Sequence, residues 1–156
     1  MKVTLIQTGK TRFNYLHEGI SDYQKRLNHY LRFDELTLPD IKNRKKLPVD
    51  EIKVREGEQL LKNCKPIDFV ILLDENGKSY SSVELANYLL KKISIGRDMV
   101  LVIGGAYGFS QEVYKRANDM ISLSRMTFSH QLVRLILVEQ LYRAMTIIRG
   151  EPYHHD

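Results

Sequence analysis

The sequence predicts an α/β fold in which a mostly parallel sheet is covered by helices on both faces. Short apolar runs alternate along the chain with longer amphipathic stretches, which is typical of strands joined by crossover helices. Two of these runs, at 68–73 and 99–103, are apolar at almost every position, as strands buried on both faces are. The length of 156 residues predicts a single domain, residues 1–156.

The first half of the chain supplies two strands and two helices. Alternating or continuous apolar residues predict strands over 3–7 and 33–38, and Pro39 ends the second of them. Apolar side chains that recur every three or four residues predict helices over 15–31 and 49–62.

The second half completes the alternation. The patterns predict further strands over 68–73, 99–103 and 120–123, and helices over 82–92, 111–118 and 129–149. The last helix, which Gly150 closes, is apolar on most sides, with Glu139, Arg143 and Thr146 as its polar ridge. Glu139 and Arg143 are one turn apart and able to pair. Such a helix is buried in the centre of one domain or covered by a second copy, and we favour a homodimer.

Ligands of parallel sheets bind beyond the carboxyl ends of the strands, which directs attention to the residues after Leu73, Ile103 and Leu123. The segment 104–108 contains three glycines in five positions, so its backbone can turn sharply and approach a ligand. Its spacing does not fit the dinucleotide-binding fingerprint. The segment 76–79 does not fit a phosphate-binding loop, because Leu72 stands where a glycine is required. The alternative for 104–108 is a tight turn with Ser110 as the helix cap.

The net charge of +5 lies in one part of the chain. Residues 1–65 carry 14 basic and 9 acidic side chains, whereas residues 66–156 carry 10 of each. The densest basic segment, 42–46, contains Lys42, Arg44, Lys45 and Lys46 and is predicted to be an exposed loop. It is either a solvated connector or a segment that contacts nucleic-acid phosphates, and the uneven charge favours the second.

Several classes of protein are excluded or disfavoured. A single cysteine, Cys64, excludes an internal disulfide framework. No apolar run approaches the roughly 18 residues that span a bilayer, and the start of the chain does not look like a signal peptide, so we expect a cytoplasmic protein without a membrane partner. We expect no metal, because His154 and His155 are neighbours in a tail without a completing ligand cluster. His130 is either a packed or capping residue or a catalytic one.

Several segments together resemble one bacterial family. They are 102–110 (VIGGAYGFS), 123–134 (LSRMTFSHQLVR), 139–144 (EQLYRA) and 148–154 (IRGEPYH), together with 57–59 (GEQ). Their order and spacing are similar to those of the ribosomal RNA large subunit methyltransferase H family, minimal members of the SPOUT methyltransferases. The resemblance covers essentially the whole chain.

The resemblance implies a fold with a C-terminal trefoil knot, an exception to the rule that chains do not thread. It also implies S-adenosylmethionine as cofactor and N3 of a pseudouridine in 23S rRNA, in the helix 69 loop of the assembled ribosome, as substrate of a homodimer. The alternatives are a non-catalytic basic ribosome- or RNA-binding protein and a SPOUT methyltransferase that acts on another RNA, such as tRNA.

The resemblance also implies which residues form the site. Its cofactor loops correspond to Leu72, Leu73, Gly104, Gly105, Leu123, Ser124, Arg125, Met126, Thr127 and Phe128. Arg143 is the candidate for stabilising the anion that forms when the substrate N3–H loses its proton. Tyr153, His154 and His130 are candidates for holding the uridine or taking that proton, and the choice of base stays open. The tail is expected to complete the site of the opposite subunit.

Overall fold

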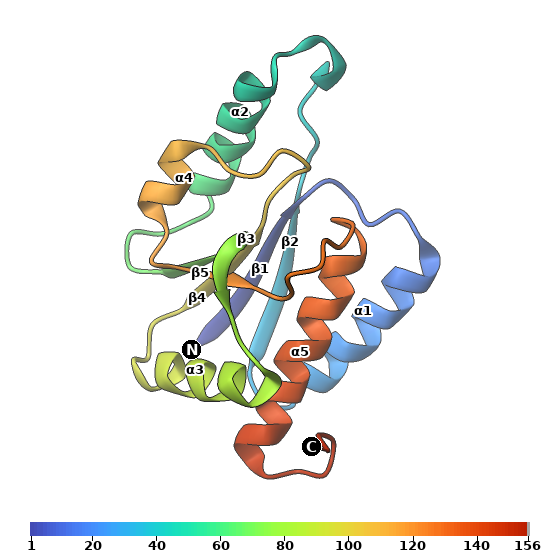
Figure 1. Ribbon diagram of the computed structural model, residues 1–156, viewed down its shortest axis with the longest axis vertical. Helices are drawn as coiled ribbons and strands as arrows, with labels where there is room; N and C mark the ends of the chain where they lie inside the picture. The colour runs from blue at the N-terminus through green and yellow to red at the C-terminus, as the bar shows by residue number, and fades with distance from the viewer. Residues whose placement is uncertain (156) are drawn as a thin grey trace.

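The computed structural model describes residues 1–155 and has an α/β architecture (Figure 1). Within these residues, the sheet consists of β1 (Lys2–Thr8), β2 (Arg32–Leu38), β3 (Phe69–Ser79), β4 (Met99–Ile103) and β5 (Asp119–Ser122). Its strand order is β2-β1-β4-β3-β5, and every neighbouring pair is parallel. The predicted parallel sheet is therefore confirmed, while Asp156, the last residue of the predicted domain, lies outside the described residues.

Helices cover both faces of the sheet. In the described part of the chain they are α1 (Asn14–Leu27), α2 (Val49–Leu61), α3 (Ser82–Ser94), α4 (Gln111–Arg116) and α5 (Leu132–Arg149), with one 3-10 turn, η1 (Arg44–Lys46). One apolar core joins the sheet to α1, α3 and α5, and a second core joins the opposite face to α2 and α4. Successive residues of β4 point into different cores, for example Leu101 into the first and Val102 into the second.

The predicted helices over 49–62, 82–92 and 111–118 differ from the structure by at most two residues at an end, and two others differ by three or more. The helix predicted over 15–31 ends at Leu27, because the Asn28 side chain accepts a hydrogen bond from the Phe33 amide (2.9 Å) and holds the chain in a turn. The helix predicted from residue 129 begins at Leu132. Thr146 is also not part of an exposed polar ridge: it is fully buried, and its hydroxyl donates to the Arg143 carbonyl at 2.7 Å.

The third strand extends beyond the predicted 68–73. The pairing of β3 with β5 shifts register between Leu73 and Lys78, so the intervening residues bulge out at the carboxyl edge of the sheet. Gly77 makes the resumed pairing possible, because a Cβ there would lie 2.5 Å from the carbonyl carbon of Ile121.

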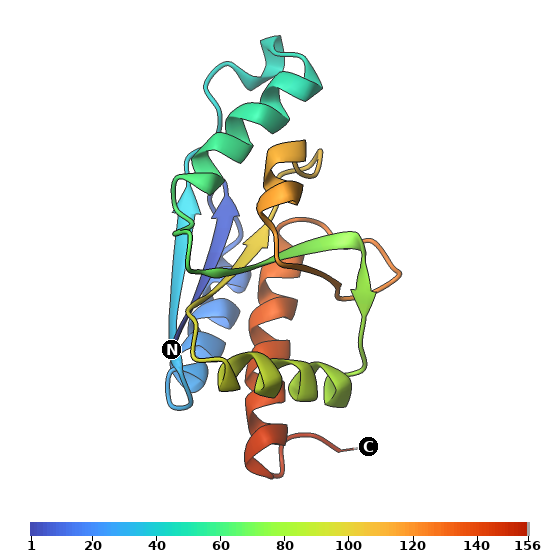
Figure 2. The same cartoon turned by 90° about the vertical axis from the view of Figure 1, so that its left-hand side faces the viewer.

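In Figure 2, α5 begins near the middle of the molecule and runs to the end where the carboxyl terminus lies. β1, β2 and β4 point away from the carboxyl terminus and toward the half of the molecule that carries η1 (Figure 2). The candidate residues of the tail are therefore separated within one chain from the loops at the carboxyl edge of the sheet.

Candidate active site

A pocket of about 480 Å³ lies at the carboxyl edge of the sheet. Three loops build it: the one after the first part of β3, the one after β4 and the one between β5 and α5. Its lining residues are Leu73, Asp74, Glu75, Asn76, Ile103, Gly104, Gly105, Ala106, Tyr107, Gly108, Phe109, Tyr114, Ile121, Ser122, Leu123, Ser124, Arg125, Met126, Thr127, Phe128, His130 and Val133.

Nearly all of the residues that the sequence assigns to cofactor binding meet at this pocket. Leu73, Gly104 and Gly105 line it together with every residue from Leu123 to Phe128. Leu72 lies inside the sheet instead, fully buried and paired with Val102 and Met120. The structure thus gathers three segments that are far apart in the sequence.

The glycine segment, which we define as residues 104–108, is packed tightly against the side chains of Phe109 and Glu56. A Cβ at Gly104 would lie 2.9 Å from the ring of Phe109, and a Cβ at Gly105 would lie 2.9 Å from Oε1 of Glu56 and closer still to Oε2. Gly108 has a φ of 78°, a left-handed conformation that favours glycine. Ser110 occupies the N-cap position of α4, as the alternative interpretation of this segment expected, but its side chain makes no capping hydrogen bond to any described residue.

Hydroxyl groups shape the loop between β5 and α5. Ser122 donates to the Ser124 carbonyl (3.0 Å), and the Met126 amide donates to the Ser124 hydroxyl (2.9 Å). The Ser129 hydroxyl then accepts a hydrogen bond from the Leu132 amide (3.1 Å) at the start of α5. These local bonds leave the Met126 side chain 76% exposed beside the pocket.

His130 lines the pocket just before α5. Burial and the positive charges of Arg134, Arg12 and Arg44 lower the pKa of His130 from its usual value. Its position is fixed by its neighbours. The Gln131 side chain accepts from the Arg12 amide at 2.8 Å, and Arg134 donates to the His130 carbonyl at 3.1 Å.

The sequence reasoning missed an acidic part of the pocket. The Tyr114 hydroxyl donates to Asp74 (2.6 Å), and burial together with this bond raises the pKa of Tyr114 to about 12. The other carboxylate oxygen of Asp74 accepts from the Asn76 amide at 2.9 Å. Asp74 and Glu75 directly follow Leu73, the end of the predicted strand, where ligands of parallel sheets bind. This position is the signal in the sequence by which they could have been found.

The remaining catalytic candidates form a second cluster at the end of α5. Arg143 pairs with Glu139 (2.6 Å between Nη2 and Oε1), as predicted, and this bond raises the Arg143 pKa. The guanidinium lies 4.7 Å from the centroid of the Tyr153 ring, and its Nη1 is 3.3 Å from Nδ1 of His154. The structure therefore brings Arg143, Tyr153 and His154 together.

The hydrogen bonds of this cluster determine which groups donate and which accept. Tyr153 donates to Glu139 (3.1 Å), so the hydroxyl of Tyr23, 3.1 Å away, donates to Tyr153. Burial and these neighbours raise the pKa of Tyr153, which keeps it protonated. Because an arginine only donates, Nδ1 of His154 is the accepting nitrogen in this contact. Tyr153 and His154 are therefore both held beside the Arg143 guanidinium.

The two clusters do not meet within one chain. Val133 lines the pocket, and Arg143 follows it ten residues later on the same helix. At 1.5 Å per residue this spacing corresponds to about 15 Å along α5. A single chain therefore holds two separate halves of the predicted site.

The basic segment, residues 42–46, is only partly exposed to solvent. Lys42, Lys45 and Lys46 are exposed, whereas Arg44 lies within 3.7 Å of Glu56 and over the ring of Tyr107 (5.1 Å). The predicted exposed loop is thus correct for the three lysines, but the segment includes η1, and Arg44 packs against the glycine segment.

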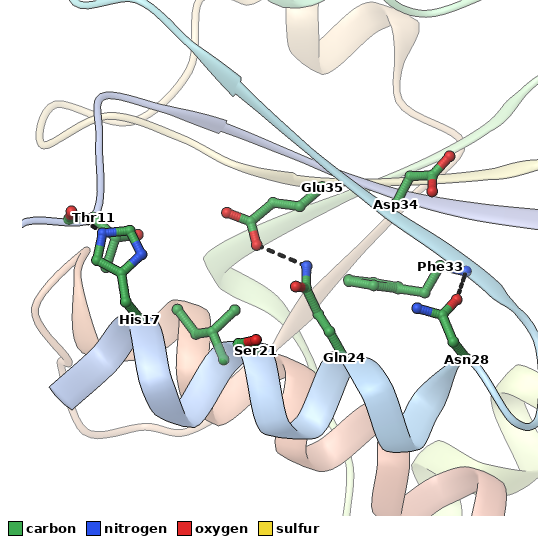
Figure 3. Close-up of a pocket in the computed structure, with 9 residues that line it drawn as sticks. Thr11, His17, Ser21, Gln24, Asn28, Phe33, Asp34 and Glu35 are labelled. Atoms are coloured by element: carbon green, nitrogen blue, oxygen red, sulfur yellow. Dashed lines mark hydrogen bonds between the residues drawn. The ribbon is translucent and has the colours of Figure 1, made fainter. Parts of the chain in front are cut away.

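A second hollow, of about 430 Å³, lies between α1 and β2 (Figure 3). Its polar side chains bind neighbouring groups: His17 bonds the Thr11 carbonyl at 2.7 Å, and Gln24 donates to Glu35 at 2.9 Å. These bonds fasten α1 to the chain around it, so we assign this hollow a structural role.

Metal-binding and membrane-spanning features are absent from residues 1–155. No group of three or more His, Cys, Asp or Glu side chains in this range is arranged to hold a metal ion. In the same residues no helix combines the length and apolarity needed to cross a membrane.

Comparison with known proteins places the chain in a family. Residues 1–154 match the family described as "Predicted SPOUT methyltransferase". The chain is 51% identical to a ribosomal RNA large subunit methyltransferase H of Parabacteroides distasonis and 52% identical to one of Flavobacterium johnsoniae, each over 100% of both chains. It also superposes on a methylase family protein of Haemophilus influenzae with a TM-score of 0.51 and 12% identity, covering 99% of this chain and 70% of that one. This chain therefore belongs to the SPOUT methyltransferases and, within them, to the ribosomal RNA large subunit methyltransferase H family.

Proposed function

We propose that the protein is an S-adenosylmethionine-dependent methyltransferase that modifies N3 of a pseudouridine in 23S rRNA, in the helix 69 loop of the assembled cytoplasmic ribosome. The observation that carries the proposal is the pocket at the carboxyl edge, where the loops that the family resemblance assigns to the cofactor converge. The names of the relatives, which are ribosomal RNA large subunit methyltransferases, support an rRNA substrate.

The pocket residues fit this cofactor. A volume of about 480 Å³ lies within the range of small-molecule sites. Gly104 and Gly105 expose bare backbone, Phe128 offers an apolar face, and Ser124 and Thr127 carry hydroxyls. When bound, S-adenosylmethionine would supply a methyl group on a sulfonium, which an in-line nucleophile would accept while the sulfur leaves as the neutral thioether of S-adenosylhomocysteine. Most of the catalytic task of this chain is then to position the two reactants.

The Arg143 cluster and His130 are proposed to activate and hold the substrate base. The substrate N3–H is a weak acid, and the Arg143 guanidinium stabilises the anion that its deprotonation produces. Tyr153 and His154 lie beside Arg143 and are the candidates for contacting the base. His130, whose lowered pKa keeps its ring neutral at neutral pH, is the candidate proton acceptor on the pocket side.

This division of the site favours a homodimer. Within one chain the Arg143 cluster lies about 15 Å along α5 from the pocket, so a second copy is needed to place the two halves around one substrate. Apolar side chains beside the pocket, such as Leu132 (38% exposed) and Met126 (76% exposed), provide surface for that contact. The trefoil knot also stays a prediction.

The proposal is tested by cofactor binding and by methyl transfer. Isothermal calorimetry with S-adenosylmethionine is expected to show saturable binding, and no binding at about millimolar cofactor would contradict the methyltransferase. Methyl-labelled cofactor is then incubated with intact ribosomes, free 23S rRNA and tRNA. Label in the ribosomal pseudouridine supports the proposal, while label in tRNA alone would move the substrate elsewhere.

The shared site is tested by mixing inactive subunits. Arg143→Ala removes the anion-stabilising group, and Gly105→Leu disrupts the pocket of the same chain, because its Cβ would collide with the Glu56 carboxyl group beneath residues 104–108. If each site takes its pocket from one subunit and Arg143 from the other, a mixed dimer has one site with both defects and one intact site. Activity should then reappear after mixing, and a mixture that stays inactive would contradict the shared site.

A further inference from the structure

Glu56 is an unusual member of α2. Its side chain is 2% exposed, and its two carboxylate oxygens accept no hydrogen bond from the described residues, 1–155. Burial raises the pKa of Glu56, while the charge of Arg44 opposes that shift and Asp40 adds to it. An ionised carboxylate in such a place is unfavourable for folding, and an apolar residue would pack there at lower cost. Core stability therefore does not account for Glu56.

The glycine segment passes directly over this carboxylate. A Cβ at Gly105 would lie within 3.0 Å of all three atoms of the Glu56 carboxyl group. The next residue of α2, Gly57, would place a Cβ 3.0 Å from Val113 and closer to the Ser110 hydroxyl. Two successive positions of α2 thus contact the glycine segment and the residues that follow it.

Arg44 also approaches the carboxylate of Glu56. Its Nη1 is 3.7 Å from Oε1 of Glu56, and its guanidinium stands 5.1 Å from the centroid of the Tyr107 ring. Tyr107 lines the pocket. Arg44 therefore connects a buried anion to an aromatic side chain of the pocket wall.

We propose that Glu56 is a positioning residue of the cofactor pocket, because its carboxylate holds Arg44 against Tyr107 and so fixes the glycine segment in its binding conformation. This inference rests on the proposed binding of S-adenosylmethionine. It reassigns Arg44 from the phosphate-binding cations of the basic segment to the pocket wall.

The test compares paired substitutions by calorimetry with S-adenosylmethionine. Glu56→Gln keeps the shape of the side chain and removes its charge, while Glu58→Gln removes the same charge at an exposed position of α2. Arg44→Gln is matched by Arg55→Gln on the exposed side of that helix. We expect Glu56→Gln and Arg44→Gln to weaken binding roughly tenfold each, and the controls to stay within about twofold. The double variant should be no weaker than either single one, because both remove the same interaction.

Two further measurements separate positioning from a role in stability. Glu56→Gln should leave the unfolding temperature unchanged or raise it, because it removes an unfavourable buried charge. Arg44→Lys should restore part of the affinity, because it keeps the positive charge. Loss of affinity together with a matching loss of stability in both variants would overturn the proposal. Arg44 is partly exposed, so its variants test the idea even if Glu56→Gln does not fold.

The outcomes also distinguish the inference from the proposed function. Wild-type binding that Glu56→Gln and Arg44→Gln leave unaltered would overturn the positioning role alone. A wild-type protein that binds no S-adenosylmethionine would overturn the proposed function and this inference with it.

Discussion

Nη2 of Arg134 donates a hydrogen bond of 2.8 Å to the carbonyl of Thr8, a residue 126 positions earlier in the chain. Arg134 is 1% exposed, and its Nη1 also donates to the Thr11 hydroxyl at 3.0 Å. The start of α5 is therefore fastened to the end of β1, and His130, whose carbonyl accepts from the same guanidinium, is held at the pocket.

Arg134→Met is expected to destabilise the fold by about 2 kcal/mol, because it keeps most of the apolar volume but leaves the buried Thr8 carbonyl without its donor. Urea unfolding followed by circular dichroism measures the loss. Arg149→Met, at the exposed end of the same helix, should change stability by less than about 0.5 kcal/mol. Equal effects of the two substitutions would show that the buried bonds contribute nothing.

Much of the fold follows from local patterns. The strand predicted over 99–103 has the observed ends, because all of its residues are apolar and buried on both faces. The helix predicted over 15–31 is too long because Tyr30 and Leu31 continue the apolar spacing, whereas the Asn28 side chain stops the helix through a contact five residues away. The spacing of apolar residues does not reveal such a hydrogen bond between a side chain and the backbone.

The site is predictable in part for the same reason. The pocket loops follow strands, so a general rule and a family resemblance point to Gly104 and to the residues from 123 onward. Glu56 looks like one more charge on a charged helix, and only packing shows that it is buried under Gly105. The separation of Arg143 from the pocket likewise could not be predicted, because it depends on the direction in which α5 runs relative to the sheet.

Arg143→Ala is expected to lower the rate of methyl transfer by roughly 100-fold or more while cofactor affinity stays within about twofold of wild type. The reason is that Arg143 is placed on the substrate together with Tyr153 and His154, and it is not one of the loop residues that are proposed to hold the cofactor. Single-turnover transfer to ribosomes and calorimetry give the two quantities. If cofactor affinity fell instead, Arg143 would have to act at the cofactor.

Neutralising the exposed lysines of the basic segment tests RNA binding. The triple variant Lys42→Gln, Lys45→Gln and Lys46→Gln should bind ribosomes more weakly, and the slope of log affinity against log salt should fall by roughly 1 for each phosphate that a lysine no longer neutralises. Cofactor affinity should not change. A control variant removes the same charge at three other exposed lysines, Lys62, Lys91 and Lys115. Equal weakening in both variants would indicate a general charge effect and no local binding of phosphates.

Gly77→Ala probes the resumed pairing of β3 with β5. The added Cβ would lie 2.5 Å from the carbonyl carbon and 2.7 Å from the nitrogen of Ile121, and backbone atoms cannot rotate away. We expect a loss of about 1–3 kcal/mol in unfolding free energy and weaker cofactor binding, because Ile121 and Ser122 line the pocket. Ser79→Ala, at an exposed position of the same strand, should change neither. A Gly77→Ala protein as stable as wild type would show that the strands can separate here without cost.

His130 gives a pH dependence whose sign follows from its environment. Burial and the charges of Arg134, Arg12 and Arg44 hold its pKa below the usual 6.5. Because the folded-state pKa lies below the unfolded one, the neutral ring stabilises the fold above about pH 6.5, and this contribution is lost as the pH falls through the folded-state pKa. The excess stability of wild type over His130→Gln, which cannot titrate, should therefore shrink between about pH 7 and about pH 5. Urea unfolding of both proteins across this range measures the difference, and parallel curves would mean that His130 titrates alike in the folded and unfolded chain.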